Sequence, residues 1–253
     1  MSGGKGKLGP LAVVAALREI RRGAGDTRPL ALGGAKELVP ILARQLRAGG
    51  DASAVREGGG VQGAAALLWV GAVDEEILRA ATRAKVPIVA VTDQDIVPYV
   101  LAEDVVRIPP GQGFPVDEIA TKVARALGER GTALAARLPV LRPAVCEHLI
   151  ASTSRKNGAI AAAVFVPGVD LPILTMNQIR MVLRIALAYG EELDQTRALE
   201  IVGVVGAGYG FRMLAREALD LVPVAGWAVK GAVAYGGTRA VGAAAIKLLE
   251  VRK

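Results

Sequence analysis

The chain has 253 residues, of which 52% are hydrophobic and 22% are charged, so it can bury the core of one large or two ordinary domains and is not a disordered chain. The basic excess that gives the net charge of +7 is spread along the chain, which favours an anionic membrane surface over nucleic acid as a partner. The single cysteine, Cys146, excludes an internal disulfide, and with His148 as the only histidine the sequence predicts no metal site.

Residues 1–27 are predicted to be a basic N-terminal segment that contains an amphipathic helix from about Pro10 to Arg22. A secretion signal is the alternative, because Lys5 and Lys7 precede an apolar stretch. It is disfavoured because charged residues follow that stretch at once and no small-x-small cleavage site precedes them.

Residues 28–130 are predicted to form a small α/β domain. Apolar runs predict strands at 28–32, 65–71, 86–91 and 104–108, and amphipathic patterns predict helices at 37–46, 74–85 and 116–127. We expect Asp74 to cap the second of these helices and residues 52–63 to form a loop after a poor strand. Strands that alternate with helices at this spacing indicate a parallel sheet, in which ligands bind at the edge formed by the strand ends.

The loops of this domain resemble those of Era-like GTPases. The string VPIVAVTDQD resembles the base-reading loop Thr-Lys-x-Asp, with Asp93 in the place of the lysine and Asp95 in that of the guanine-reading carboxylate. The string VVRIPPGQGFPVDEI resembles the last strand and following helix, and residues 57–60 resemble the Asp-x-x-Gly loop. The resemblance implies a degenerate P-loop GTPase-like domain.

The phosphate-binding loop is where the sequence departs from these GTPases. That loop needs Gly-x4-Gly-Lys-Ser/Thr, whose hydroxyl holds Mg²⁺, whereas the sequence after Gly33 and Gly34 reaches Lys36 too early and continues with Glu37. We therefore expect a pseudo-GTPase. Two alternatives stay open: a residual nucleotide binder or GTPase that uses Gly33, Gly34, Lys36 and Asp95, and a small α/β domain unrelated to GTPases.

Residues 131–150, which contain Pro139 and Pro143, are predicted to be a linker with a helical end, and residues 151–253 a helical domain. Its helices are expected at about 154–166, 171–189, 195–220 and 224–251. Asp170 is predicted to cap the second helix and Gly190 to end it. Arg180 and Arg184, one turn apart, form either a solvated or salt-bridged face or a cationic rim for headgroups or carboxylates of a partner.

Small residues recur at helical spacing near the C-terminus and predict close helix packing. They form a GxxxG pair on the third helix and an i, i+4 ladder on the fourth: Gly206, Gly210, Ala228, Ala232, Gly236, Ala240 and Ala244. Charged residues interrupt every candidate membrane span, so an interfacial or hairpin-inserted domain is expected rather than a simple span.

The last hundred residues resemble the Gly-rich helical domain of the YcjF-like family of unknown function. The residues that carry this resemblance are the Val-Pro entries at 166–167 and 222–223, Asp170, residues 178–184, and the strings GWA and YGGTR. The family is membrane-associated and is found fused to, or encoded beside, Era-like GTPases. No catalytic residues are established for it, so the resemblance implies none.

Together these features predict a non-enzymatic interaction or scaffold protein on the cytoplasmic side of a membrane, without a cofactor. Its expected partners are an anionic membrane surface and a GTPase or a second copy of the chain, with no nucleic acid. Arg180, Arg184, Lys230 and Arg239 are the residues predicted to contact the membrane or partner. The alternatives are a residual GTP binder or GTPase, and a soluble helical scaffold for a partner GTPase.

Overall fold

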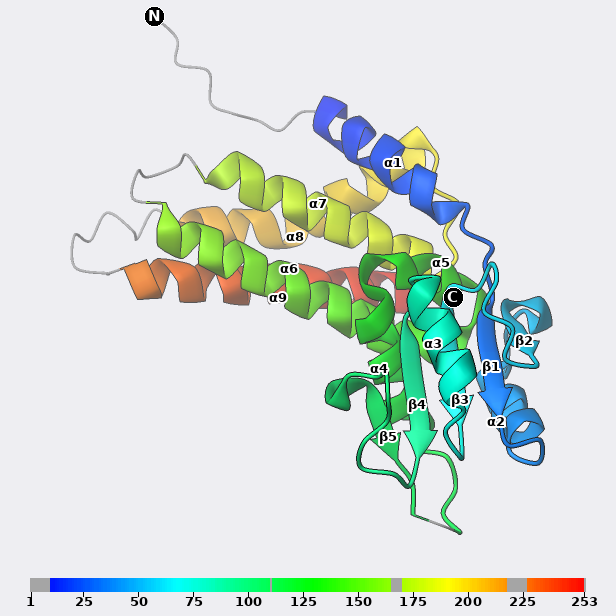
Figure 1. The fold of residues 1–253 in the computed structure, drawn as a ribbon. Coiled ribbons are helices and arrows are strands. Elements are labelled where there is room, and N and C mark those ends of the chain that lie inside the picture. Colours follow the sequence, from blue (N-terminus) through cyan, green and yellow to red (C-terminus); the bar gives the residue numbers. More distant parts are fainter. Residues whose placement is uncertain (1–9, 110, 165–169, 218–226, 253) are drawn as a thin grey trace, which may run out of the picture. The chain divides into compact units, whose positions relative to one another are not determined.

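The computed structural model describes residues 10–109, 111–164, 170–217 and 227–252, and the chain forms two compact units (Figure 1). Residues 25–148 make an α/β unit, and residues up to Ala24 together with those from Leu149 onward make a helical unit. An α/β domain followed by a helical domain is thus confirmed. The N-terminal helix, which the sequence predicts to be a separate segment, is part of the helical unit.

The α/β unit contains a parallel sheet of five strands in the order β2-β1-β3-β4-β5. Its strands are β1 (Leu30–Gly34), β2 (Val55–Glu57), β3 (Ala66–Val70), β4 (Ile88–Thr92) and β5 (Val105–Arg107). This order occurs in doubly wound α/β folds, and its direction of winding reverses between β1 and β3. The three central strands are buried almost throughout, because helices cover both faces of the sheet.

The helices of this unit are α2 (Val39–Leu46), α3 (Glu75–Arg83), α4 (Val116–Leu127) and α5 (Gly131–Arg137). Right-handed crossovers place α2 and α3 on opposite faces, because the connection through α2 runs to one side of β1 and that through α3 to the other. Leu78 of α3 packs with Leu67 and Trp69 of β3 in the core under that helix. Asp74 caps α3 as predicted, accepting hydrogen bonds from the amides of Glu76 and Ile77 at 3.1 and 3.2 Å.

Two segments of the α/β unit differ from the sequence-based prediction. Residues 55–57, expected to lie in a loop, form the edge strand β2, which pairs with β1. The predicted linker, 131–150, is mostly helical: it contains α5, a short 3₁₀ turn at Pro139–Leu141 and the start of α6 (Arg142–Ala163). Pro139 and Pro143 do not break these elements, because each stands in a first turn, where its missing N–H has no role.

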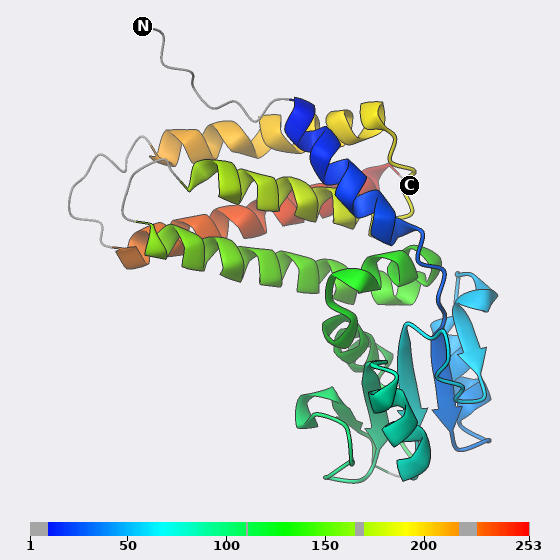
Figure 2. The ribbon, with the colours of Figure 1, turned by 45° about the horizontal axis from the view of Figure 1, so that its top comes forward.

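The helical unit contains α1 (Pro10–Ala24), most of α6, α7 (Leu171–Ala188), α8 (Gln195–Glu217) and α9 (Trp227–Val251). Figures 1 and 2 show α6 to α9 running side by side, with α1 lying across α7 and α8. Predicted helix ends near 166, 220 and 224, and the Val-Pro pairs at 166–167 and 222–223, lie outside the described residues.

The start and the end of α7 follow different rules. Gly190 ends the helix as predicted, with φ at +82° and its amide donating to the Leu187 carbonyl at 2.8 Å. The prediction that Asp170 caps the helix is wrong, because its side chain makes no capping hydrogen bond. Its backbone is already helical (φ −78°, ψ −26°), whereas the capping residue Asp74 is extended (φ −109°, ψ 100°).

Candidate functional site

The carboxyl edge of the sheet is where a doubly wound fold places its ligand, and the predicted nucleotide residues lie in its loops. Gly33 and Gly34 end β1, and Lys36 follows in the turn before α2. Asp95 follows β4, which β3 separates from β1. The sequence thus assigned these residues to the correct edge of the sheet.

Backbone hydrogen bonds close this edge between β1 and β3. The amide of Ala35 donates to the Val70 carbonyl at 2.8 Å, so the pairing of the two strands continues into the turn. Gly34, with φ at +121°, lies so close to β3 that an added Cβ would stand 1.9 Å from the Val70 oxygen. A ligand crevice requires the two loops to separate, and here they are bonded together.

The loop after β2 closes the same edge from the other side. The amides of Gly58 and Gly59 both donate to the Leu32 carbonyl, at 3.0 and 3.1 Å. A Cβ on Gly33 would lie 2.6 Å from the Gly59 Cα and 2.8 Å from the Trp69 ring. These glycines therefore allow the loop to pack on β1 over the tryptophan, and their space is taken by protein atoms.

The charged candidates at this edge lie at the surface of the α/β unit. Lys36 is exposed, and Glu37 directly after it is exposed as well. Asp95 forms an ion pair with Arg107 at 3.0 Å, with 79% of its side chain exposed.

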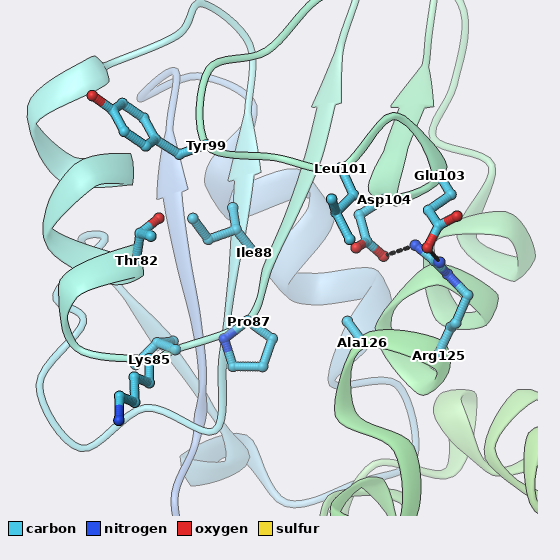
Figure 3. Close-up of a pocket in the computed structure, with 11 residues that line it drawn as sticks. Thr82, Lys85, Pro87, Ile88, Tyr99, Leu101, Glu103, Asp104, Arg125 and Ala126 are labelled. Atoms are coloured by element: carbon cyan, nitrogen blue, oxygen red, sulfur yellow. Dashed lines mark hydrogen bonds and ion pairs between the residues drawn. The ribbon is translucent and has the colours of Figure 1, made fainter.

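A pocket of about 480 Å³ lies at the opposite edge of the sheet, beside the amino ends of β4 and β5 (Figure 3). Pro87, Ile88 and Leu101 form its apolar part, and Glu103, Asp104 and Arg125 form a charged cluster at one side. Two of its lining residues, Lys85 and Tyr99, have φ angles of +55° and +66°, which non-glycine residues rarely adopt. The sequence did not indicate this pocket, because its residues come from three separate segments, 82–88, 99–104 and 125–126.

The charged cluster of the pocket is internally paired. Arg125 of α4 donates to Asp104 and forms a second ion pair with Glu103. Burial raises the pKa of the Asp104 carboxyl, and the hydrogen bond from Arg125 reduces that rise without cancelling it. The Nε of Arg125 is buried without a hydrogen-bond partner among the described residues.

The polar groups around the pocket do not converge on one point. Figure 3 shows the ends of Lys85 and Tyr99 pointing away from the cluster of Glu103, Asp104 and Arg125. The Tyr99 hydroxyl instead accepts from Arg79 Nε at 2.9 Å. The arrangement can bind an apolar group, but it holds no nucleophile with a base in hydrogen-bond reach of it.

The arginines predicted on the helical unit are engaged within the protein. Glu19 of α1 accepts from Nε and a terminal nitrogen of Arg180 at 3.0 and 2.7 Å, and Arg184 approaches the same carboxylate at 4.0 Å. Lys230 and Arg239 lie half-buried on α9. The structure therefore groups Arg180 with Arg184 and gives them an acidic partner that the sequence did not indicate, 161 positions away for Arg180.

The predicted small-residue ladder does not form the inner face of α9. Ala228, Ala232 and Gly236 are exposed, and Ala240 and Ala244 are only half-buried. On α8, Gly206 is exposed, and the surroundings of Gly210 are not described. The close approach of α9 uses other glycines. A Cβ on Gly231 would lie 3.0 Å from the Gly158 carbonyl oxygen, and one on Gly242 would lie 2.4 Å from the Ile150 side chain.

A buried polar layer joins α6, α7 and α9 at their contact. The Asn157 amide nitrogen donates to Thr238 Oγ1 at 3.0 Å and to the Leu174 carbonyl at 3.2 Å. Its oxygen accepts from Asn177 at 2.8 Å, and Gln178 donates to Thr238 at 3.2 Å. The layer holds no ionisable group, so it fixes how the helices pack and offers no acid or base for chemistry.

Among the described residues, α7 is the one helix long and apolar enough to cross a membrane, and half of that stretch is buried inside the protein. Comparison of the chain with protein-family models, with curated proteins and with solved structures finds no match in any of the three.

Proposed function

We propose that this chain is a non-enzymatic, membrane-associated interaction protein whose α/β unit is a GTPase-like module without nucleotide chemistry. The observation that carries the proposal is the closed carboxyl edge, where Ala35 bonds to Val70 and Gly33 packs on Gly59 and Trp69. A phosphate-binding loop must leave its amides free for the ligand, and here the Ala35 amide is used within the sheet.

The role of the α/β unit as an interaction module is supported by its exposed apolar loop. Ile96, Tyr99 and Leu101 are 85%, 46% and 64% exposed, close together in sequence and next to the pocket of Figure 3. Apolar side chains grouped at a surface are typical of contacts with other proteins. A partner GTPase or a second copy of the chain is the occupant that the sequence resemblance implies.

Membrane association is supported by α7 and by the arginines beside it. The helix has the length and composition of a membrane-inserting segment, and Arg180 and Arg184 are placed on one of its stripes. Cations on such a stripe interact with anionic headgroups. The soluble helical scaffold is the second candidate, and the half-buried state of α7 is the observation that favours it.

The nucleotide part of the proposal is tested with purified protein, GTP and Mg²⁺. We expect phosphate release no faster than in buffer and no binding of a fluorescent GTP analogue. The control is Lys36→Ala, which should behave like the wild type because Lys36 is exposed and Glu37 follows it. Turnover that Lys36→Ala abolishes would contradict the proposal and establish the residual GTPase.

The membrane part is tested by flotation with phosphatidylcholine vesicles, with and without phosphatidylglycerol. We expect the protein to float with the vesicles, and more of it when the anionic lipid is present, because basic side chains add about 1 kcal/mol each near such a surface. Absence of flotation on both vesicles, together with a discrete oligomer in solution, would replace the membrane function with the soluble scaffold.

A further inference from the structure

Helix α1 covers α7, although the whole α/β unit separates the two in the sequence. Its buried residues, Val13, Ala16, Leu17 and Ile20, recur at i, i+3, i+4 and i+7 and form one apolar face. Figure 2 shows that this helix lies across α7 and α8. The opposite face of α1 carries Arg18 and Arg22, which are exposed, so α1 is an amphipathic helix of the kind that lies at membrane interfaces.

Burial on α7 is not confined to one side. Met181, Val182 and Leu183 are consecutive, and each is at most 2% exposed. Successive residues point 100° apart around a helix, so three in a row are buried only when neighbours pack on more than one side. Both α9 and α1 pack on α7. Removing α1 would therefore uncover apolar surface of α7 that the chain otherwise keeps from solvent.

The contact between α1 and the rest of the unit ends in a polar latch, which we define as Glu19 with Arg180 and Arg184. The carboxylate of Glu19 is 48% exposed, so solvent and ions reach the latch. Arg21 adds a hydrogen bond from its Nε to the Leu193 carbonyl at 2.8 Å. Partly exposed ion pairs hold a geometry at a small net gain in stability, so another anion can compete with this one.

We propose that α1 is a releasable cover: phosphate groups of anionic lipid headgroups replace Glu19 at Arg180 and Arg184, α1 leaves, and the uncovered side of α7 enters the membrane. This inference rests on the proposed membrane association and adds its regulation. It accounts for two arginines on α7, the helix long and apolar enough to cross a membrane, that both approach the carboxylate of one glutamate from a distant segment. The chain leaves α1 through Gly25, which has no heavy atom within 4 Å of where its Cβ would be, so the exit is not packed.

The test changes the latch in the whole chain and measures flotation on phosphatidylcholine vesicles. The headgroups of these vesicles carry no net charge, so an added arginine does not increase binding by electrostatic attraction alone. Glu19→Arg places three positive side chains together and opens the latch. The double variant Glu19→Arg with Arg180→Glu restores an opposite-charge pair. Glu192→Arg, at an exposed glutamate elsewhere in the helical unit, makes the same change in net charge and serves as the matched control.

We expect Glu19→Arg to bind neutral vesicles at least about tenfold more tightly than the wild type. The reason is that a larger fraction of the variant has α1 released, which is the state that binds the membrane. The charge-swapped pair and Glu192→Arg should bind like the wild type. Circular dichroism should show the same helix content in all variants, which separates release of α1 from unfolding.

A covalent latch gives the opposite test. In the double variant Glu19→Cys with Arg180→Cys, a thiol-cleavable bismaleimide that joins the two positions should abolish flotation on vesicles that contain phosphatidylglycerol, and reduction of the linker should restore it. The native Cys146 is fully buried and does not compete for the reagent. Equal flotation of the linked, cleaved and wild-type proteins would overturn the cover while leaving membrane association intact. If no variant floats on any vesicle, membrane association itself fails and the cover with it.

Discussion

Gly158 of α6 and Gly231 of α9 face each other across the contact of their helices, and neither position has room for an ordinary side chain. A Cβ on Gly158 would lie 3.1 Å from the Gly231 carbonyl oxygen, and one on Gly231 would lie 3.0 Å from that of Gly158. The two helices therefore approach through backbone, and this pair, rather than the ladder that includes Gly236, sets their spacing.

Substitution of leucine for Gly231 and for Gly236 of α9 should change stability in opposite directions. Gly231→Leu forces α6 and α9 apart and should lower the free energy of unfolding by about 1–3 kcal/mol. Gly236→Leu meets no heavy atom within 4 Å and should raise it by about 0.7 kcal/mol, because leucine favours helix more than glycine does. Urea unfolding followed by circular dichroism measures both. A loss of stability in Gly236→Leu would return the ladder to the packing face on which the sequence placed it.

Two buried polar residues of α6 should respond differently to alanine. Asn157→Ala leaves the buried Asn177 amide nitrogen without its acceptor, removes one of the hydrogen bonds to Thr238, and should cost about 1–3 kcal/mol. Ser154 is also fully buried, but its hydroxyl has no hydrogen-bond partner among the described residues, so Ser154→Ala should be neutral or stabilise by up to about 1 kcal/mol. The same urea titration compares the two, and equal losses would show that Ser154 has a partner, such as a bound water.

Because the carboxyl edge of the sheet is closed, adding a single methyl group at Gly33 should lower the stability of the α/β unit. Gly33→Ala brings a Cβ within 2.6 Å of the Gly59 Cα and should destabilise the α/β unit by about 1–3 kcal/mol. Gly60→Ala, which meets nothing within 4 Å, is the matched control and should stay within about 0.5 kcal/mol of the wild type. Thermal unfolding followed by Trp69 fluorescence, in a Trp227→Phe background, reports on this unit. An unaffected Gly33→Ala would mean that the edge is open in solution.

Asp104 and Asp26 should give opposite dependences of stability on pH. Burial raises the pKa of Asp104 above 3.8, so the folded chain takes up its proton before the unfolded chain does. The stability of the wild type relative to Asp104→Asn should therefore rise as the pH falls from neutrality to about 4. The hydrogen bond from Arg28 lowers the pKa of Asp26, so the stability of the wild type relative to Asp26→Asn should fall as the pH drops below 3.8.

Both differences come from urea titrations at a series of pH values, with each variant paired with the wild type at the same pH. Comparing each variant with the wild type at the same pH removes the contributions of the other carboxyl groups to the pH dependence of stability, because all proteins in the series share these groups. A difference for Asp104 that falls toward acid pH would show that its ion pair with Arg125 outweighs its burial.

The elements that sequence predicted well are those whose own residues determine them. β3, β4 and α4 have continuous apolar runs or a clear helical period, and the structure contains them within a few residues of the predicted bounds. β2 was missed because it has only three residues, two of them charged, and is a strand only by pairing with β1. The α5–α6 region was missed because prolines were interpreted as breaks rather than as first-turn residues.

The sites were less predictable than the fold, because they depend on which residues meet across long stretches of sequence. Small residues at a spacing of four identify one stripe of α9, but Gly231 and Gly242 lie on a different stripe. Which of the two stripes is buried depends on where α6 packs. The loops after β1 and β4 were assigned to the correct sheet edge by the alternation of strands and helices. That Trp69 fills the space next to Gly33 depends on the register of β1 and β3, which the sequence does not show.

The inclusion of α1 in the helical unit has a consequence for how the chain is made. The α/β unit is inserted between α1 and the helices it packs on, so α1 leaves the ribosome more than 160 residues before the end of α7. At translation rates of 5–20 residues per second this interval lasts roughly 10–30 s. During it the apolar face of Val13, Leu17 and Ile20 has no native partner, while the α/β unit can already fold. The helical unit is thus completed after the α/β unit, from segments on either side of it, and the nascent α1 exposes an apolar face to which a chaperone or a membrane surface can bind in the meantime.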